Sequence, residues 1–532
     1  MDSANVALPD LDRMSVVELK ILVRGKHAEI LSQSEQLRVQ DEDLRSCKTE
    51  IELLKLQILK LRRMQFGQKS EKRARQIEQL ELLVEDLEEN DAQIACAAID
   101  KQKPERGTSA KKPRRVFPPH LPRETRTISP REQECPDCGG ALKLLGEDVC
   151  ETLELEPIRF KVIRTVRPKM ACACCDTIVQ AQAQSRPIER GLAGPALLAR
   201  VLVGKYCDHQ PLYRQSEAFA REGVDLDRSL LADWVGSTSA LLAPLTEALR
   251  AHVFAAEVVH GDDTPIPVLA PGRGKTKTGR FWTYVRDERP AAGQAAPAVW
   301  FAYSPDRKGL HPQRHLDDFT GVLQADGYSG FSKIYEKGDV KEASCWAHVR
   351  RYFFDLHESQ KSLIAAEALE RIAALYAVES DIRGRPADHR RAVRCERSRP
   401  LLDAMKTWFT QTLERISQKS ETAKAIRYAL TRWEALNRYC NDGRIEIDNN
   451  AAERALRCVA LGRKNYLFAG SDAGGKRAAA IYSLIGTAKL NGCNSEAYLR
   501  DVLTRIADHP ITQIDELLPW NFKSAAGQTK VA

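Results

Sequence analysis

The sequence has no uninterrupted apolar run of about eighteen residues, which is roughly the minimum for a membrane-spanning helix. It also lacks a signal-peptide pattern near its amino terminus. The hydrophobic content of 43% and the charged content of 29% are ordinary for folded proteins. We therefore expect a cytoplasmic protein without a membrane partner. Because 532 residues exceed what one hydrophobic core usually supports, we also expect several domains.

Acidic residues are scarce in one stretch of the chain. Between Lys101 and Arg126, nine Lys and Arg residues are accompanied only by Glu105 and Glu124. Five prolines in the same stretch exclude a regular helix or a central strand. We interpret residues 96–131 as a basic, proline-rich linker. Such a stretch is either a solvated connection or an arm that contacts phosphates, and the sequence favours neither.

The fourteen cysteines do not read as a disulfide framework, because most of them are scattered. Four fall in two CxxC pairs, and strand-like sequence lies between the pairs. This spacing is typical of a zinc ribbon, which we place at residues 132–183. We predict one structural Zn²⁺ bound by Cys135, Cys138, Cys172 and Cys175. Cys174 lies inside the second pair and could replace a neighbour, and unmetallated buried thiols are the alternative.

The amino-terminal region has a seven-residue apolar repeat. The repeat consists of Ile30, Leu37, Leu44, Ile51 and Ile58, with Leu54 and Leu61 at the intermediate positions of the later turns. This pattern is typical of a coiled coil. We predict a helical region at residues 1–95 through which the chain forms a homo-oligomer. An intramolecular helical hairpin is the alternative.

Residues 184–250 read as helical. A first predicted helix begins near Arg214, a turn contains Gly223, and a second helix follows Asp227 and includes Trp234. This spacing is that of a helix-turn-helix, whose second helix can enter a major groove. Many helical hairpins share the pattern, so the region is either a DNA-binding unit or a plain helix pair.

Strand-like runs dominate residues 251–360. They cover residues 256–260, 280–285, 298–303 and 321–325. Asp262 and Asp326 each follow the carboxyl end of such a run, where carboxylates emerge from a sheet into a shared cleft. Taken singly, Asp262 could be a turn residue before Thr264, and Asp326 with Gly327 could be a strand-to-helix turn.

A third acid, Glu453, lies on a predicted helix in residues 441–532, after a helical insertion at residues 361–440. Asn450 and Glu453 also have the spacing of a capping box, a purely structural role. Basic residues that we expect to contact DNA accompany the three acids: Arg350, Arg351, Arg454, Arg457, Arg463 and Lys464. His348 is either beside the same cleft or a structural histidine.

The three acids together predict a site for two Mg²⁺ ions that cuts and rejoins phosphodiester bonds. Asp262, Asp326 and Glu453 would be both metal ligands and catalytic residues, and double-stranded DNA would be the partner. Two alternatives remain. One is a nuclease that uses the same acids without joining ends. The other is a DNA-binding regulator without enzymatic activity, which leaves the three acids unexplained.

Four segments closely resemble the transposases of the insertion-sequence-66 family, a branch of the DDE transposases. They are HGDDTPIPVL, LQADGYSGF, CWAHVRRYFFD and IEIDNNAAERALRCVALGRKNYLFAGS. The resemblance extends to LRRMQFGQKSEK, CPDCGG and DHQPLYRQSEAFAREGVDL, and so covers nearly the whole chain. It implies an α/β RNase H-like catalytic domain in which Asp262, Asp326 and Glu453 are the metal-binding acids. It also implies a mobile element in bacteria whose ends the protein recognises, and small accessory proteins. Asp263 departs from the family pattern, which usually has Glu there, so any auxiliary role of this second acid is an open question.

Overall fold

The computed structural model describes residues 48–58, 70–99, 117–156, 159–189, 191–269, 276–465 and 469–523, with Lys20, Lys26, Ser34 and Arg38. Two compact units are distinguished, Met1–Leu87 and Glu88–Ala532. Of the described helices, none combines the length and apolar character needed to cross a membrane.

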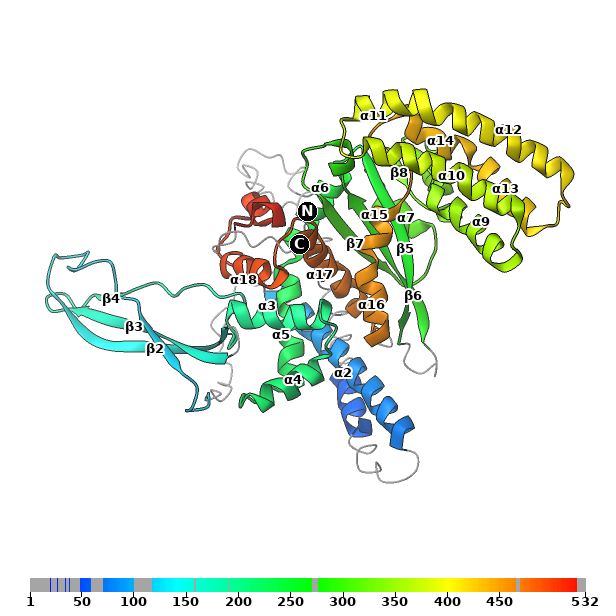
Figure 1. Cartoon of the computed structure of the whole chain (residues 1–532). Coiled ribbons are helices and arrows are strands. Elements are labelled where there is room, and N and C mark those ends of the chain that lie inside the picture. Colours follow the sequence, from blue (N-terminus) through cyan, green and yellow to red (C-terminus); the bar gives the residue numbers. More distant parts are fainter. Residues whose placement is uncertain are drawn as a thin grey trace. The chain divides into compact units, whose positions relative to one another are not determined.

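A five-stranded mixed sheet has the strand order β7-β6-β5-β8-β9 (Figure 1). The strands are β5 (Val258–Val268), β6 (Lys277–Arg286), β7 (Ala298–Ser304), β8 (Gly321–Gln324) and β9 (Val340–Ala343). β5, β6 and β7 pair antiparallel, whereas β5, β8 and β9 pair parallel. The mixed α/β character expected of this region is therefore confirmed, and the predicted runs at 280–285, 298–303 and 321–325 correspond to β6, β7 and β8.

β5 differs from the strand expected at residues 256–260, because it continues to Val268. The parallel register with β8 ends at the pair His260 and Gln324, whereas the antiparallel register with β6 continues to Val268 and Lys277. Asp262 therefore lies within β5, and not after its end. Pro265 is tolerated in this extension because the register with β8 has already ended, so the ring removes no hydrogen bond to that strand.

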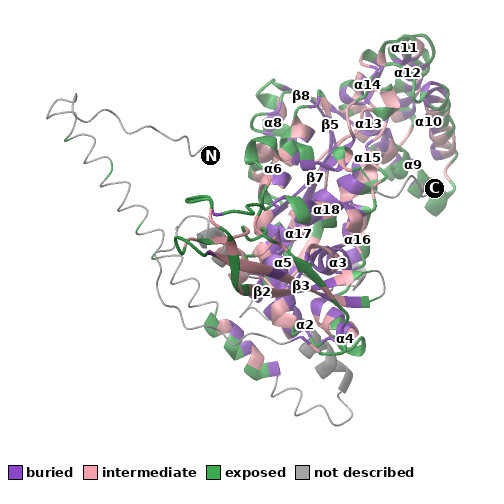
Figure 2. Cartoon of the chain, turned by 90° about the vertical axis from the view of Figure 1, so that its left-hand side faces the viewer, coloured by how far each residue is buried: buried purple, intermediate pink, exposed green. Residues whose placement is uncertain are grey.

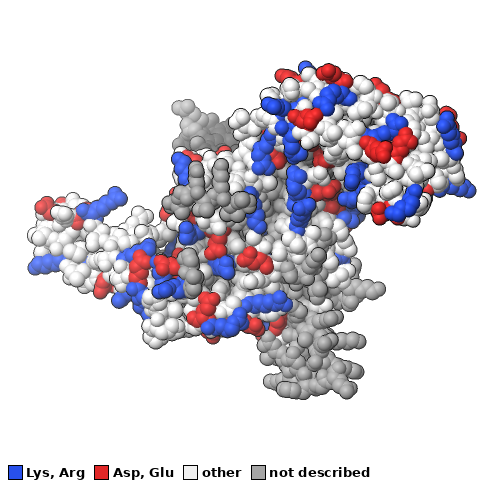
Figure 3. All heavy atoms as spheres, in the orientation of Figure 1, with Lys and Arg blue, Asp and Glu red and all other residues white. Residues whose placement is uncertain are grey.

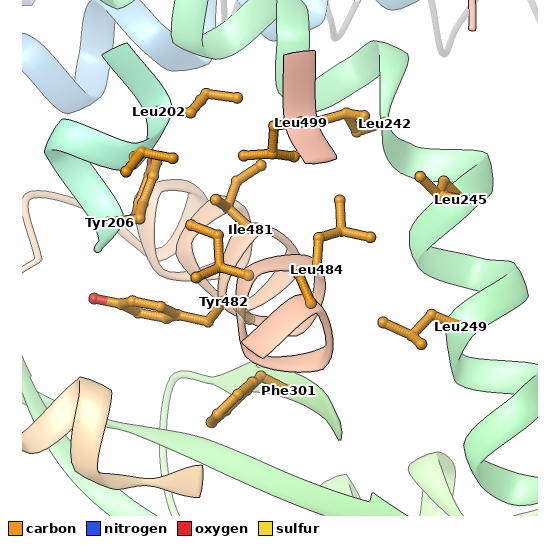
Figure 4. Close-up of a cluster of buried hydrophobic side chains, with 14 of the residues drawn as sticks. Leu202, Tyr206, Leu242, Leu245, Leu249, Phe301, Ile481, Tyr482, Leu484 and Leu499 are labelled. Atoms are coloured by element: carbon orange, nitrogen blue, oxygen red, sulfur yellow. The ribbon is translucent and has the colours of Figure 1, made fainter. Parts of the chain in front are cut away.

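Helix α17 (Asp472–Leu490) covers β7, an edge strand of the sheet. The Ser483 hydroxyl accepts from the backbone N–H of Phe301 at 2.8 Å, and the Thr487 hydroxyl accepts from that of Val299 at 3.0 Å. Two N–H groups of the sheet edge are thereby satisfied by side chains one helical turn apart. Figure 2 shows buried residues where α17, α5 and β7 lie, and Figure 4 shows leucines of α3 and α6 around α17.

The helices before the sheet are α3 (Pro195–Tyr206), α4 (Leu212–Arg221), α5 (Arg228–Leu241) and α6 (Ala243–Phe254). The helix pair expected near Gly223 is present as α4 and α5. However, α5 is mostly buried, and Asp233 is its exposed residue. A Cβ on Gly236 would lie 2.1 Å from the Glu89 carbonyl oxygen, so another backbone covers this face of α5. In this structure α5 does not present a basic surface to a DNA groove.

A second hydrophobic core joins the helices that follow β9. These are α9 (Trp346–Gln360), α10 (Leu363–Ile382), α11 (Ala387–Val393), α12 (Arg399–Arg415), α13 (Glu421–Thr431) and α14 (Trp433–Asn441), with a π-helical turn at Arg394–Ser398. Glu379 is buried here between two arginines, and Arg394 donates to both of its oxygens at 2.7 Å. The helical segment expected at residues 361–440 therefore shares this core with α9 and with Val322 and Ala343 of the sheet, and it has internal charge pairing.

The four-cysteine unit is a β structure of β1 (Arg123–Thr127), β2 (Leu142–Glu156), β3 (Arg159–Cys172) and β4 (Ile178–Gln180). The interpretation of residues 96–131 as an irregular linker is wrong in part, because β1 lies inside that range and pairs parallel with β3. The prolines allow this because Pro122 directly precedes the strand and none lies within it, and because β1 is at the sheet edge.

Helix α2 spans Ser70–Ile99 and so continues beyond the limit of residue 95 expected for the helical region. Of the heptad positions, Ile30, Leu37, Leu44 and Leu61 lie outside the described residues. Ile51, Leu54 and Ile58 are helical and buried within a single chain. This burial fits the intramolecular alternative, so self-association stays a prediction.

The remaining elements connect or follow those above. The α-helices are α7 (Leu310–His315), α8 (Ser332–Glu336), α15 (Asn450–Ala455), α16 (Arg457–Asn465) and α18 (Ser495–Arg505). The 3₁₀ turns are Arg289–Ala291, Ser329–Phe331, Ile511–Leu517 and Pro519–Asn521. α15 packs against β5 and β6, which brings the helix carrying Glu453 to the sheet.

Candidate functional site

Asp262 and Asp326 occupy equivalent places on neighbouring parallel strands. His260 of β5 is paired with Gln324 of β8, and each aspartate lies two residues further along its strand direction. Side chains two residues apart on a strand point to the same face. The two aspartates therefore lie on neighbouring chain segments, Asp262 within β5 and Asp326 after the end of β8, and the charge of Asp326 acts on Asp262.

The pKa of Asp262 is raised by its surroundings. Burial, together with the charges of Asp326, Asp263 and Glu453, raises the pKa of Asp262 from 3.8 to about 7. The backbone N–H of Asp263 donates to Asp262 Oδ1 at 2.7 Å, which opposes the shift. A largely buried carboxylate beside other acids favours the binding of a cation, because a bound cation would compensate this repulsion.

We expect the stability of the metal-free protein to fall as the pH rises through the range from about 4 to about 7. The pKa of Asp262 is raised from 3.8 to about 7 on folding, so the folded state holds a proton that the unfolded state has released. Its contribution is complete below the unfolded value and is lost as pH rises through the folded value. Thermal melts without added divalent cations would measure this, and Asp262→Asn should flatten the pH dependence. An unchanged dependence in this variant, or an equal flattening in the exposed-site variant Asp317→Asn, would contradict the expectation.

Asn449 fixes the start of α15 against β5. Its side-chain Nδ2 donates to the Gly261 carbonyl oxygen at 2.8 Å, so its Oδ1 accepts from His260 Nδ1 at 3.1 Å. The next residue, Asn450, donates its backbone N–H to Asp448 Oδ1 at 3.1 Å, which satisfies a free N–H at the helix start. Glu453 instead has His348 Nδ1 and the Arg351 guanidinium at 3.9 Å.

The three acids are close, but they are not one tight cluster. Two groups of possible metal ligands in the described part of the chain have donor atoms all within 4.8 Å of one another, and neither includes Asp262 or Asp326. A single ion would need a tighter set. A pair of cations about 4 Å apart accepts carboxylate oxygens up to about 8 Å apart, since each oxygen lies about 2.1 Å from its own ion. Two ions would therefore tolerate a wider spacing of these acids than a single ion would.

Asp263 belongs to an ion-pair network that the sequence did not reveal. Its side chain is 2% exposed and contacts Arg280 and Arg307, each at 2.8 Å. The Arg307 guanidinium also stacks over the Tyr328 ring at 4.1 Å. Tyr328 follows Asp326 by two residues and donates its backbone N–H to Asp326 Oδ1. Asp263 thus holds a half-exposed arginine next to the two aspartates.

The expected DNA-contacting residues are partly described. Arg350, Arg351, Arg454 and Arg457 are exposed, the first two on α9 and the others on α15 and α16. The side chains of Arg463 and Lys464 lie outside the described residues. Figure 3 shows the face of the molecule that is turned to the viewer in Figure 1. Between the sheet and helices α10–α14 on this face, Lys and Arg side chains are interspersed with acidic ones. This arrangement can supply positive charge around the acids.

The four paired cysteines converge at one end of β2 and β3. Cys135, Cys138, Cys172 and Cys175 have their sulfur atoms within 4.8 Å of one another, and Cys174 is not in the group. The backbone N–H of Cys174 instead donates to Cys172 Sγ at 3.3 Å. Hydrogen bonding with Thr177 lowers the pKa of Cys175 to about 6, which favours the thiolate that zinc needs. The donor set fits one structural Zn²⁺, with no open position for a substrate.

Family models match most of the chain. The model described as "Transposase IS66 family" matches residues 190–477, and that described as "IS66 C-terminal element" matches 483–520. The "zinc-finger binding domain of transposase IS66" matches 132–176, the region of the four cysteines. The model described as "Transposase C of IS166 homeodomain" matches residues 53–126.

Similar chains occur in Sinorhizobium fredii (strain NBRC 101917 / NGR234). The uncharacterized protein y4hP is 46% identical over 497 residues, 90% of each chain. The uncharacterized protein y4qI is 41% identical over 482 residues, 88% of each chain. The uncharacterized protein y4jD is 39% identical over 417 residues, 77% of this chain and 82% of its own. The similarity thus extends through the helical, four-cysteine and sheet regions.

Proposed function

Because this chain belongs to the IS66 family of transposases, with a DDE catalytic domain, we propose that it binds the ends of an insertion sequence and catalyses Mg²⁺-dependent DNA strand cleavage and strand transfer. The observation that carries the proposal is that Asp262 and Asp326 each lie two residues beyond the last pair, His260 and Gln324, of two parallel strands, with Glu453 within electrostatic reach of Asp262. The activity belongs in the bacterial cytosol, where small proteins of the same element are possible partners.

The proposed catalytic residues are Asp262, Asp326 and Glu453, in an RNase H-like domain. The mixed sheet supports this fold assignment, because β5, β6 and β7 are antiparallel and β5, β8 and β9 are parallel. The helices α10–α14 would be an insertion between β9 and the helix that carries Glu453. In this arrangement two acids come from the sheet and the third comes from a helix packed on it.

In the proposed mechanism the carboxylates of Asp262, Asp326 and Glu453 would hold two Mg²⁺ ions. When bound, the two ions supply Lewis-acid activation of the attacking oxygen and stabilise the leaving oxygen. Arg307, held by Asp263, adds positive charge next to the acids. Water would first attack the phosphodiester at the element end, breaking the bond between phosphorus and O3′ and leaving a 3′-OH and a 5′-phosphate. That 3′-OH would then attack a target phosphodiester, join to its phosphorus and release the 3′-OH of the target strand. The carboxylates form no covalent intermediate.

Cleavage assays on DNA carrying the element ends test this function. We expect Mg²⁺-dependent products with a 3′-OH, and joined products when target DNA is added. Cleavage without joining under the same conditions would support the nuclease alternative. Specific binding without metal-dependent cleavage would support the regulator alternative and would contradict the proposal.

Arg454 and Arg457 are proposed to contact the DNA backbone. Both are exposed and adjoin the helix of Glu453. We expect the double variant Arg454→Ala/Arg457→Ala to weaken binding similarly for all DNA sequences. The slope of log affinity against log salt should fall by about 1 for each lost phosphate contact. Filter binding at several salt concentrations measures this. Arg505→Ala on α18, which pairs with Asp501, should leave the slope unchanged, and an equal change in this control would refute the assignment.

The amino-terminal helices are proposed to join copies of the chain. We expect removal of residues 1–87 to lower the oligomeric state measured by light scattering. The deletion should stop there because Glu89 is fully buried and contacts Lys205 and Arg477. Removing Glu89 would leave two buried cations without this partner. An unchanged number of chains per particle would support the intramolecular hairpin instead.

A further inference from the structure

A second group of possible metal ligands lies beside the proposed catalytic acids. Its members are Cys345, His348 and Glu453, whose donor atoms all lie within 4.8 Å of one another. Cys345 is the residue before α9, and His348 lies in the first turn of that helix. Glu453 comes from α15, roughly a hundred residues later in the chain. The group therefore exists only because α9 and α15 meet.

Two polar atoms of this group lack a hydrogen-bond partner. His348 Nδ1 and Glu453 Oε1 are both buried, are 3.9 Å apart, and form no hydrogen bond within the described part of the chain. Buried polar atoms are nearly always satisfied, so a pair that faces each other without a partner calls for an explanation. A bound ion between them would satisfy both atoms.

Cys345 adds a soft ligand to this pair. Its side chain is buried, and its sulfur accepts the backbone N–H of Asn449 at 3.1 Å. The side chains of His348 and Glu453 are 21% and 30% exposed, so an ion has a route from solvent. Ligand atoms around one Zn²⁺ lie about 3.2 to 3.8 Å apart, given bonds of about 2.0 to 2.3 Å. Small rotations of the two partly exposed side chains would reach that geometry.

We propose that Cys345, His348 and Glu453 form a binding site for Zn²⁺ or a similar transition-metal ion, and that occupancy of this site withdraws Glu453 from the catalytic Mg²⁺ ions. On binding, the Cys345 thiol releases its proton to solvent and the thiolate bonds to the metal, while His348 contributes a ring nitrogen and Glu453 a carboxylate oxygen. The regulatory part rests on the proposed function, because it assigns Glu453 to catalysis.

The ligand types favour a transition metal over Mg²⁺. Thiolate and imidazole ligands select zinc and related ions, whereas Mg²⁺ prefers oxygen ligands in an octahedron. The site also differs from the four-cysteine unit, because its three protein ligands leave a position open to solvent. Zinc should therefore bind here more weakly than in the four-cysteine unit, and act as a reversible inhibitor.

Metal binding can be tested without any DNA. Full-length protein with zinc in its four-cysteine unit would be titrated with Co²⁺, and thiolate-to-cobalt absorption would be followed. We expect a band in the wild type that is lost in Cys345→Ser and that persists in the control Cys395→Ser, which removes an exposed thiol. His348→Ala should weaken Co²⁺ binding by at least about tenfold. If circular dichroism shows that Cys345→Ser is misfolded, the Co²⁺ affinity of His348→Ala tests the metal site in its place. If Cys345→Ser and His348→Ala both had the absorption spectrum and the Co²⁺ affinity of the wild type, the proposed metal site would be refuted.

Inhibition tests the regulatory part separately. For each variant, the rate of Mg²⁺-dependent cleavage with added Zn²⁺ would be divided by its own rate without Zn²⁺. We expect strong inhibition of the wild type and of Cys395→Ser, and at least about tenfold weaker inhibition of Cys345→Ser. Equal inhibition of all three would overturn the regulatory role. Absence of cleavage in every protein would instead contradict the proposed function, while the Co²⁺ titration would still decide whether the metal site exists.

Discussion

Asp326→Asn is expected to abolish Mg²⁺-dependent strand cleavage while leaving DNA binding intact. The amide keeps the size of the side chain and its place after β8, but it removes the negative charge that holds a divalent cation. Loss of a metal ligand forfeits several kcal/mol of transition-state stabilisation, which corresponds to a rate at least about a thousandfold lower. Binding should persist because the proposed phosphate contacts come from other residues, among them Arg454 and Arg457.

Asp317→Asn is the matched control for this substitution. Asp317 is an exposed aspartate in the same part of the chain, and it pairs with Lys337 at 3.1 Å on the surface. This variant should cleave like the wild type. Undiminished cleavage by Asp326→Asn, measured on element-end DNA with a melting temperature near that of the wild type, would refute the assignment of Asp326.

Cys138→Ser is expected to release zinc and unfold the four-cysteine unit. The sulfur of Cys138 lies 3.4 Å from that of Cys175 and 3.5 Å from that of Cys172, so one substitution breaks the ligand set. Zinc binding in small metal-dependent units contributes on the order of 10 kcal/mol to folding, which exceeds the stability of most such units alone. Metal analysis should find about one Zn²⁺ per wild-type chain and less in the variant. Proteolysis should cut the variant within residues 132–183.

Cys174→Ser separates the two interpretations of the second cysteine pair. Cys174 lies outside the group of four sulfurs and contributes a backbone N–H to Cys172. A serine there keeps that N–H, so zinc content and protease resistance should match the wild type. Zinc loss in Cys174→Ser with retention in Cys175→Ser would instead make Cys174 the ligand.

Local patterns were sufficient to predict three strands of the five-stranded sheet and the convergence of the four paired cysteines. Runs of apolar and β-branched residues predicted β6, β7 and β8 within one or a few residues of their bounds. The CxxC spacing predicted the four sulfurs because two residues between ligands is a local constraint of a knuckle. The length of β5 was not predictable, since its extension depends on pairing with β6 while the register with β8 stops.

Tertiary contacts explain what the sequence did not reveal. Asp263 and Arg307 are 44 residues apart, and nothing in either segment indicates that they pair. Cys345 and Glu453 are also distant in sequence, and the tertiary contact between α9 and α15 brings them together. The backbone of Glu89, far upstream in the chain, covers one face of α5. A local helix-turn-helix pattern does not distinguish an exposed second helix from a covered one.

Locating bound cations would test the central claim most directly. Crystals of the full chain with element-end DNA and Mn²⁺ in place of Mg²⁺ would show the metals by anomalous scattering. We predict two Mn²⁺ peaks about 4 Å apart, bounded by the carboxylates of Asp262, Asp326 and Glu453. Peaks that involve the two aspartates while Glu453 stays turned away from them, or no peak at these residues, would contradict the account.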